Sequence, residues 1–440
     1  MQAADVTEAV ERAWRAESAR IVAGVAGVVR DVGLAEELAA DALVAALEQW
    51  PAEGVPDNPG AWLMLTARRR AIDRIRRDVR LRERVAQLGH EAHQRQQSAT
   101  FDGTADYEAV IEADDDALND DLLRLIFVSC HPVLGAEARV ALALRVLGGL
   151  STAEIARAFL APEPTIAQRI VRAKRTLADK RIPFEVPPPA QRAARLASVL
   201  EVLYLIFNEG YSATAGDDWL RPALCEEGLR LVRILADLTP TEPEVFGLLA
   251  LMEIQGSRLA ARVGSAGEPI ALPDQDRTRW DQAMIHQGFA ALLHAERLLR
   301  AGDQPGSAAG PYVLQAAIAA CHARASTPEE TDWGRIAALY ARLAELMPTP
   351  VVELNRAVAL ARSQGPAAGL EIVDRLAGEP AMRDYHLLPA VRADLLDRLG
   401  RRDEARAEYE RAAALTANAR ERSVLLDRAA PPDPAEGGAP

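Results

Sequence analysis

The order of apolar and polar residues in the first part of the chain predicts helices rather than strands. Apolar side chains recur at intervals of three and four residues, and strict alternation with β-branched residues is rare. Between residues 18 and 50 this spacing predicts two helices. Their apolar positions are Ile21, Val22, Val25, Val28 and Val29 in the first, and Leu34, Leu38, Leu43, Leu47 and Trp50 in the second. The prolines and glycines of PAEGVPDNPG, residues 51–60, then require a loop.

A strongly basic helix is predicted directly after that loop. Its sequence, WLMLTARRRAIDRIRR from Trp62 to Arg77, is rich in arginine and has Asp73 as its one acidic residue. The composition then reverses, because residues 98–121 contain nine acidic residues, no lysine or arginine, and few apolar anchors. Such a segment is typical of an exposed linker, and we place this linker at residues 89–121.

The stretch LSTAEIARAFLAPEPTIAQRIVRAKRTL, residues 150–177, predicts a helix-turn-helix. Ser151 or Thr152 can cap a short helix with Glu154 in its first turn, and two prolines then force a turn. The second helix is predicted to begin near Thr165. Its inward positions are Ile166, Ile170, Ala173 and Leu177, and its exposed polar positions are Gln168, Arg169, Arg172, Lys174 and Arg175. A helical hairpin with a solvated basic face is the alternative.

The C-terminal part of the chain has a loose period near 35 residues from Asp332 onward. The unit RADLLDRLGRRDEARAEYERAAAL resembles a tetratricopeptide repeat, whose paired helices stack into a concave surface. Ordinary helical hairpins are the alternative. The run PFEVPPPAQR, which starts at Pro183, predicts a boundary before this extension.

Composition supports an all-α protein of several domains. The chain has 440 residues, more than one core usually holds, and Ala, Leu and Arg recur throughout. No apolar run is long enough to cross a bilayer and the N-terminus is unlike a signal peptide, so we expect a cytoplasmic protein with no membrane contact. Its three cysteines, Cys130, Cys225 and Cys321, have no spacing typical of zinc sites, and we expect buried thiols.

No motif with a catalytic mechanism is present. A glycine-rich phosphate loop, an HExxH sequence and a nucleophile elbow are all missing. Cys130-His131 and Cys321-His322 are adjacent pairs, and neighbouring side chains on a helix diverge by about 100°. We therefore predict that the protein is not an enzyme and has no catalytic residue, metal site or cofactor.

Together these motifs resemble the extracytoplasmic-function (ECF) sigma factors of RNA polymerase. Trp62-Leu63, Ala67-Arg68 and Ala71-Ile72-Asp73-Arg74 are similar to the promoter-melting helix of that family, and EIARAF with TIAQRIVRAKRTL is similar to its second DNA-reading domain. Cys130-His131-Pro132, the middle segment and GPYVLQAAIAACHA resemble a subgroup that has a tetratricopeptide-like C-terminal extension.

The resemblance implies two partners, the β and β′ subunits of core RNA polymerase and promoter DNA. The segment from Leu34 to Leu47 is similar to the polymerase-binding helix of the family, although Ala40 and Leu43 depart from its usual residues. The residues that would bind core polymerase are Glu36, Glu37, Asp41, Leu43 and Trp50.

The same resemblance implies which residues contact DNA. Those for the -10 element are Asp57, Asn58, Trp62, Arg68, Arg69, Arg70, Arg76 and Arg77; those for the -35 element are Thr165, Gln168, Arg169, Arg172, Lys174 and Arg175. Trp62 has two open roles, stacking on an extruded base or packing in the core. The acidic linker also has two, mimicry of nucleic acid inside the polymerase or a simple tether.

The implied architecture is two small helical sigma domains followed by a large helical extension. The ranges are 1–88 for sigma region 2, 89–121 for the linker, 122–183 for sigma region 4, 184–325 for a family-specific helical domain, 326–430 for tetratricopeptide-like repeats, and 431–440 for a disordered tail. The extension is expected to regulate the sigma factor through an unknown protein or ligand. The alternative is a helix-turn-helix regulator that works without core polymerase, and a repeat scaffold with no nucleic-acid role is a third hypothesis.

Overall fold

The computed structural model describes residues 3–90, 115–212, 220–264, 269–301 and 308–430. In these ranges all regular elements are helices, and one isolated bridge pairs Val263 with Pro269. The all-α prediction is confirmed. None of the helices in the described ranges is both long and apolar enough to span a bilayer. The chain divides into two compact units, residues 1–203 and 204–440.

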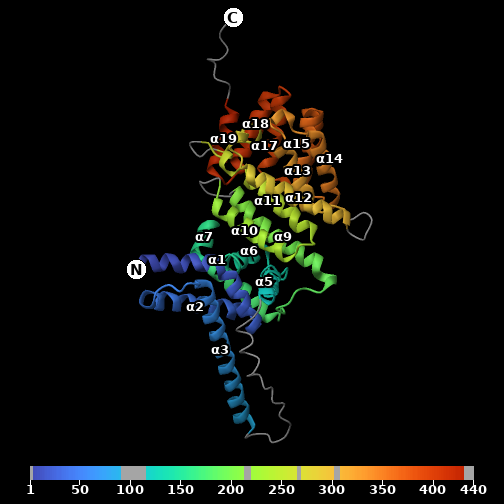
Figure 1. Cartoon of the computed structure of the whole chain (residues 1–440). Helices are drawn as coiled ribbons and strands as arrows, with labels where there is room; N and C mark the ends of the chain where they lie inside the picture. The colour runs from blue at the N-terminus through green and yellow to red at the C-terminus, as the bar shows by residue number, and fades with distance from the viewer. Residues whose placement is uncertain (1–2, 91–114, 213–219, 265–268, 302–307, 431–440) are drawn as a thin grey trace. The chain divides into compact units, whose positions relative to one another are not determined.

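Three helices begin the N-terminal unit (Figure 1): α1 (Ala3–Val29), α2 (Val32–Glu53) and α3 (Pro59–His90). Asp31 caps α2 by accepting a hydrogen bond from the backbone N–H of Leu34 at 2.8 Å, and Asn58 accepts one from Ala61 at 3.0 Å near the start of α3. The helix α2 extends three residues into the predicted loop. Pro51 lies in its last turn, and the chain turns away at Gly54, whose φ is 92°.

The second part of this unit contains α5 (Asp115–Ser129), α6 (Ala136–Val146), α7 (Thr152–Ala158) and α8 (Glu163–Asp179). The predicted linker at 89–121 is too long, because α3 extends to His90 and α5 begins at Asp115. Leu118 and Leu122 are buried, and α5 packs on α1. Burial of these two leucines stabilises the first turns of α5, which the acidic composition of the segment did not predict. The remainder of the linker, residues 91–114, lies outside the described residues.

The N-terminal unit also extends beyond the boundary predicted at residue 183. It includes the first half of α9 (Pro189–Tyr211). Arg195 donates to the backbone oxygen of Phe127 at 2.7 Å, and Ser198 donates to that of Cys130 at 2.7 Å. These hydrogen bonds join α9 to the end of α5, so the proline-rich stretch separates two helices within one unit.

The C-terminal unit continues with helices in sequence order. They are α10 (Pro222–Leu238), α11 (Pro243–Gly256), α12 (Gln282–Ala301), α13 (Pro311–Arg324), α14 (Trp333–Leu346), α15 (Pro350–Gln364), α16 (Pro366–Leu376), α17 (Leu387–Arg398), α18 (Arg402–Leu415) and α19 (Ala419–Ala429). From α13 to α19 each helix packs on the next. Gly365 and Gly400 have positive φ in the turns after α15 and α17, and their separation agrees with the predicted period of about 35 residues.

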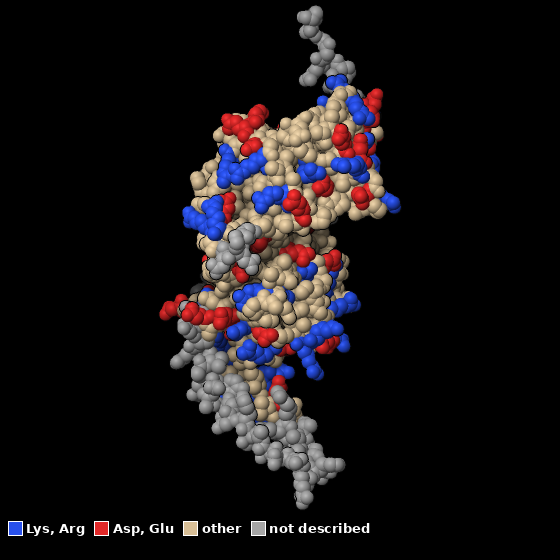
Figure 2. Space-filling model, turned by 90° about the vertical axis from the view of Figure 1, so that its right-hand side faces the viewer, with Lys and Arg blue, Asp and Glu red and all other residues tan. Residues whose placement is uncertain are grey.

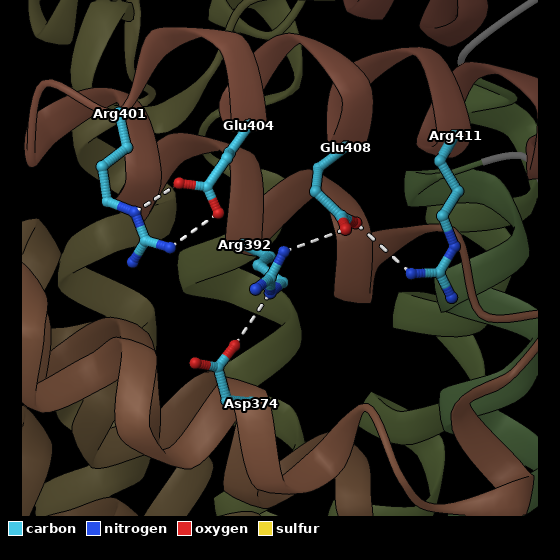
Figure 3. Close-up of polar contacts among 6 residues, drawn as sticks. All are labelled: Asp374, Arg392, Arg401, Glu404, Glu408 and Arg411. Carbon is cyan, nitrogen blue, oxygen red and sulfur yellow. Dashed lines mark hydrogen bonds and ion pairs between the residues drawn. The ribbon is translucent and has the colours of Figure 1, made fainter.

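Charged side chains on this C-terminal unit are mixed rather than gathered by sign. In the upper part of Figure 2, acidic and basic groups lie next to one another. Arg392 on α17 is an example, because it donates to Asp374 on α16 at 2.8 Å and to Glu408 on α18 at 3.0 Å (Figure 3). The carboxylates raise the pKa of Arg392, the hydrogen bond to Asp374 being the largest cause. Arg392 therefore connects three helices of this unit.

The expectation for the cysteines is also confirmed. All three are free and buried. Burial raises the pKa of Cys130 and of Cys225 to about 12, so these thiols stay protonated at neutral pH.

Candidate nucleic-acid interface

The helix-turn-helix begins with a capping box. The backbone N–H of Glu154 donates to Ser151 Oγ at 3.2 Å, and the backbone N–H of Ser151 donates to Glu154 Oε2 at 2.8 Å. Ser151, rather than Thr152, is therefore the N-cap of α7. Ile155 and Ala156 are buried beneath it.

The second helix, α8, begins at Glu163, two residues before the predicted start. Pro162 is its N-cap and Pro164 lies in its first turn, where proline needs no hydrogen-bond partner. The four predicted inward residues are all buried: Ile166, Ile170, Ala173 and Leu177. The orientation of this helix was therefore predicted correctly from its apolar spacing.

The outer face of α8 exposes Thr165, Gln168, Arg172 and Arg175. Gln168, Arg172 and Arg175 follow one another at three- and four-residue spacing, so they form one stripe. Val171 beside this stripe is 63% exposed, and it was not among the predicted contacts. A helical wheel of α8 could have predicted this exposure, because Val171 lies far from the buried stripe. A stripe with amide and guanidinium groups can donate hydrogen bonds to base edges in a major groove.

Two predicted contacts of the -35 element lie instead on the flanks of α8. Arg169 forms an ion pair with Glu137 of α6 at 2.7 Å. Lys174 forms an ion pair with Glu36 of α2, which also binds Arg145 of α6 at 2.6 Å. The structure thus brings together Lys174, a predicted DNA contact, and Glu36, a predicted polymerase contact.

The basic helix α3 exposes several of its arginines. Arg69, Arg76 and Arg77 are exposed, and Arg77 donates to the backbone oxygen of Asp73 at 3.2 Å. Arg70 is half-buried and lies 3.6 Å from the carboxylate of Asp41 on α2. These four residues follow one side of α3, where a nucleic-acid backbone could contact them.

Arg68 does not belong to this exposed set. It is only 5% exposed, and its guanidinium lies against α1 at Gly24, where an added Cβ would be 3.2 Å from Nη2. Burial lowers the pKa of Arg68, and the charge of Asp121 opposes that shift. The prediction that Arg68 contacts DNA therefore conflicts with this position, because adjacent arginines on a helix point in different directions.

The loop before α3 carries two residues that were predicted to contact the -10 element. Asp57 and Asn58 are both exposed, and the Asn58 side chain is engaged in the hydrogen bond to Ala61. Trp62, one turn into the helix, is half-buried and packs edge-on against Trp50 of α2. Packing is thus one function of Trp62, and part of its side chain remains exposed.

The predicted polymerase-binding residues of α2 fall into two groups. Glu37 and Asp41 are exposed and Leu43 is half-buried, whereas Trp50 is 1% exposed and belongs to the core. Trp50 therefore has no surface for a partner, contrary to the prediction. Glu36 is also buried, at 7% exposed, because it binds Arg145 and Lys174, and this position conflicts with its predicted contact to polymerase.

Leu47 was predicted to be inward, yet it is 42% exposed next to Val44 at 51%. The exposed apolar surface of Val44 and Leu47 was not predicted. The sequence pattern placed Leu43 and Leu47 inward, whereas the buried residues of this part of α2 are Ala42, Ala45 and Ala46.

The adjacent Cys-His pairs form no metal site in the described ranges. No group of three His, Cys, Asp or Glu side chains there could hold a metal ion. His131 Nδ1 instead accepts a hydrogen bond from the backbone N–H of Val133 at 3.0 Å. His131 thus stabilises the turn after α5, whereas Cys321 and His322 lie within α13, where His322 packs edge-on against Trp333.

Comparison with protein families finds three matches along the chain. Residues 8–81 match sigma-70 region 2, residues 124–177 match sigma-70 region 4, and residues 195–296 match a family of unknown function, DUF6596.

Three relatives extend the comparison. An uncharacterized protein of Rhizobium meliloti (strain 1021) is 43% identical over 90% of this chain and 89% of its own length. The probable ECF RNA polymerase sigma factor SigI of Mycobacterium tuberculosis is 30% identical over 43% of this chain and 61% of its own length, so this chain spans less than two thirds of that relative. The ECF RNA polymerase sigma factor SigK of Mycobacterium ulcerans is 31% identical over 36% of this chain and 78% of its own length. With both sigma-70 regions present, the chain belongs to the ECF sigma factors of RNA polymerase.

Proposed function

We propose that this sigma factor binds core RNA polymerase mainly through α2 and directs it to a two-part promoter. In this proposal the loop before α3 and the exposed arginines of α3 contact the opened -10 region. The outer stripe of α8 reads the -35 element. The observation that supports the proposal best is the exposed stripe of Gln168, Arg172 and Arg175 on a helix whose other side is fully packed.

The contact with polymerase would involve the exposed part of α2. Glu37 and Asp41 supply negative charge, and Val44 and Leu47 supply apolar surface beside it. An interface of this kind has an apolar centre and a polar rim. The β and β′ subunits are the partners that the family suggests. The protein needs no active site of its own for this function.

The C-terminal unit is proposed to regulate the sigma domains by binding a further protein or ligand. Its successive packed helices resemble repeat proteins, which use extended surfaces for binding. Removal of residues 204–440 would test this function. A change in promoter-dependent transcription supports a regulatory role, and unchanged transcription contradicts it.

A gel shift on a promoter fragment tests the sigma-factor proposal itself. The fragment is incubated with the protein alone, with core polymerase alone, and with both. A heparin-resistant complex that needs both components is the expected result. Specific binding by the protein alone, with no effect of core polymerase, would instead identify a helix-turn-helix regulator that works independently.

A further inference from the structure

Three arginines of the C-terminal unit lie on or beside two short 3-10 helices that pack on each other. Arg258 and Arg262 flank η2 (Leu259–Ala261), and Arg277 is the first residue of η4 (Arg277–Arg279). Both helices belong to the stretch that matches DUF6596. Because the two helices are in contact, arginines from separate parts of the sequence come close together.

Each of these arginines lies over an aromatic ring. Cζ of Arg262 is 3.7 Å from the ring centroid of Tyr211, and Cζ of Arg277 is 4.9 Å from that of Trp280. Cζ of Arg258 is 5.8 Å from both centroids. Arg258 is therefore the neighbour that the other two share, and we call the three residues the arginine cluster.

Much of the arginine cluster is removed from water. Arg258 is 9% exposed, Tyr211 is 7% exposed and Trp280 is 4% exposed. Arg262 and Arg277 are half-buried, so the cluster reaches the surface through these two side chains. A guanidinium group that leaves water needs a negative charge nearby or acceptors for its N–H groups, because an uncompensated buried charge is costly.

The residues that the structure describes meet this need only in part. Arg258 donates to Tyr211 Oη at 2.7 Å, and among these residues it has no other hydrogen bond and no carboxylate partner. Arg277 donates to two backbone oxygens at the end of α13, at 2.5 and 2.7 Å. In the same described ranges, Nε of Arg258, Nε of Arg277 and Nε1 of Trp280 are buried donors without an acceptor.

The positive charges of the cluster also act on one another. Burial is the largest cause that lowers the pKa of Arg262 and of Arg277, and the charge of Arg258 lowers both as well. Glu329 and Glu330 oppose this effect at Arg277, yet its pKa stays below the ordinary value. The cluster therefore has more positive charge than its described surroundings balance.

We propose that the arginine cluster binds a phosphate dianion, either inorganic phosphate or the phosphoryl group of a small metabolite. Guanidinium groups bind phosphate oxygens through paired N–H donors, and three neighbouring positive charges favour a dianion over a single carboxylate. A nucleobase has no ring to stack on, because Tyr211 and Trp280 are buried and guanidinium groups lie over them. The inference deepens the proposed regulatory role of the C-terminal unit, and it rests on that role only for an effect on transcription.

Isothermal titration calorimetry of the full chain, without polymerase, tests binding directly. Inorganic phosphate and glycerol 3-phosphate are separate titrants in a phosphate-free buffer, and sodium chloride at equal ionic strength is the control. We expect saturable binding that chloride does not reproduce. Binding of inorganic phosphate identifies the free ion as a sufficient ligand, and binding of glycerol 3-phosphate alone identifies a phosphomonoester. If neither titrant binds wild-type protein, the site is overturned.

Two variants test whether the arginine cluster is the site. Arg262→Met and Arg277→Met each remove one half-buried guanidinium, and each should weaken binding by at least about tenfold. Arg324→Met is the matched control, because Arg324 is exposed and its Cζ lies 5.1 Å from the ring centroid of Phe289, outside the cluster. Circular dichroism first compares the fold of each variant with that of wild type. Unchanged affinity in a folded variant of the cluster would overturn the assignment.

Asp217 and Asp218, which lie outside the described residues, are the alternative source of negative charge. The double variant Asp217→Asn, Asp218→Asn tests them in the same titration. If this variant binds phosphate and wild type does not, carboxylates of the chain itself neutralise the arginines, and the proposal fails.

Transcription with core polymerase then separates the site from its use. The bound titrant should change the yield of promoter-dependent transcript with wild-type protein and have no effect with Arg277→Met, while Arg324→Met should respond like wild type. Saturable binding without any effect on transcription would contradict the regulatory role of the C-terminal unit and leave the site intact. Loss of binding in calorimetry would overturn the site itself, so the two failures are distinguishable.

Discussion

The indole rings of Trp50 and Trp62 meet edge to face, with centroids 5.4 Å apart and ring planes at 71°. Trp50 is in the last part of α2 and Trp62 in the first part of α3, on either side of the loop that carries Asp57 and Asn58. This contact fixes where the loop begins and ends. The position of the proposed -10 contacts therefore depends on a packing interaction between two tryptophans.

Replacing Trp50 should reduce stability before it affects any partner. Trp50→Ala removes a fully buried indole, and we expect the free energy of unfolding to fall by about 3–5 kcal/mol, with part of that loss due to the ring contact. Trp50→Phe should cost less, since it keeps an aromatic ring. Urea unfolding of the full chain, followed by far-ultraviolet circular dichroism, measures both variants. A loss of polymerase binding by Trp50→Ala with unchanged stability would instead assign Trp50 to the interface.

Charge reversal on the outer stripe of α8 should impair promoter recognition without unfolding the protein. Arg172 is exposed on the face opposite the buried residues, so Arg172→Glu is expected to weaken -35-dependent binding by about 10- to 100-fold. The control Arg12→Glu makes the same change on the exposed surface of α1. Binding of the polymerase complex is measured on promoters with intact and scrambled -35 elements. Equal affinity of Arg172→Glu and wild type for the intact promoter would exclude Arg172 from recognition.

The features that were predicted correctly from the sequence are local ones. The capping box joins residues three positions apart, and the buried stripe of α8 follows from helical spacing alone. Such patterns are complete within one or two turns. The all-α fold class and the helix-turn-helix could therefore be recognised before any tertiary contact was known.

The features that the sequence did not reveal concern residues whose surroundings come from distant parts of the chain. Arg68 is one of three consecutive arginines, and only the packing of α1 and α5 decides that it is buried. Lys174 and Glu36 are 138 positions apart, and no periodic pattern relates them. The start of α5 was missed for the same reason, because its acidic first turn is stabilised by apolar burial against α1.

The ion pairs of Arg392 should contribute measurably to the stability of the C-terminal helices. The side chain is 22% exposed and binds carboxylates on two other helices. Arg392→Met leaves Glu408, itself 15% exposed, with one cation fewer, and we expect a loss of about 1–3 kcal/mol in the free energy of unfolding. Arg401→Met is the control. It removes only an exposed ion pair with Glu404, three residues away, and should change the stability little. Thermal unfolding by calorimetry compares the two, and equal melting temperatures would show that the α16–α18 network adds nothing.

The stability of the C-terminal unit should fall as the pH decreases from about 6.5 to 4, because His322 is held neutral. Burial, together with the positive charges of Arg258 and Arg277, lowers the pKa of His322 to about 4. In the unfolded chain the imidazole binds a proton near its ordinary pKa of about 6.5, so the unfolded state binds more protons between these two values. The free energy of unfolding then decreases by up to about 3 kcal/mol across this range.

His322→Phe isolates this effect because it keeps an aromatic ring beside Trp333, whose ring centroid lies 5.2 Å from that of His322. The variant cannot bind the proton, so its unfolding free energy should depend less steeply on pH between 6.5 and 4 than that of wild type. Chemical unfolding at half-unit pH intervals measures both slopes. If the unfolding free energies of wild type and variant depend on pH with the same slope, His322 binds its proton equally in the folded and unfolded states. The burial of His322 and the neighbouring guanidinium groups would then not lower its pKa.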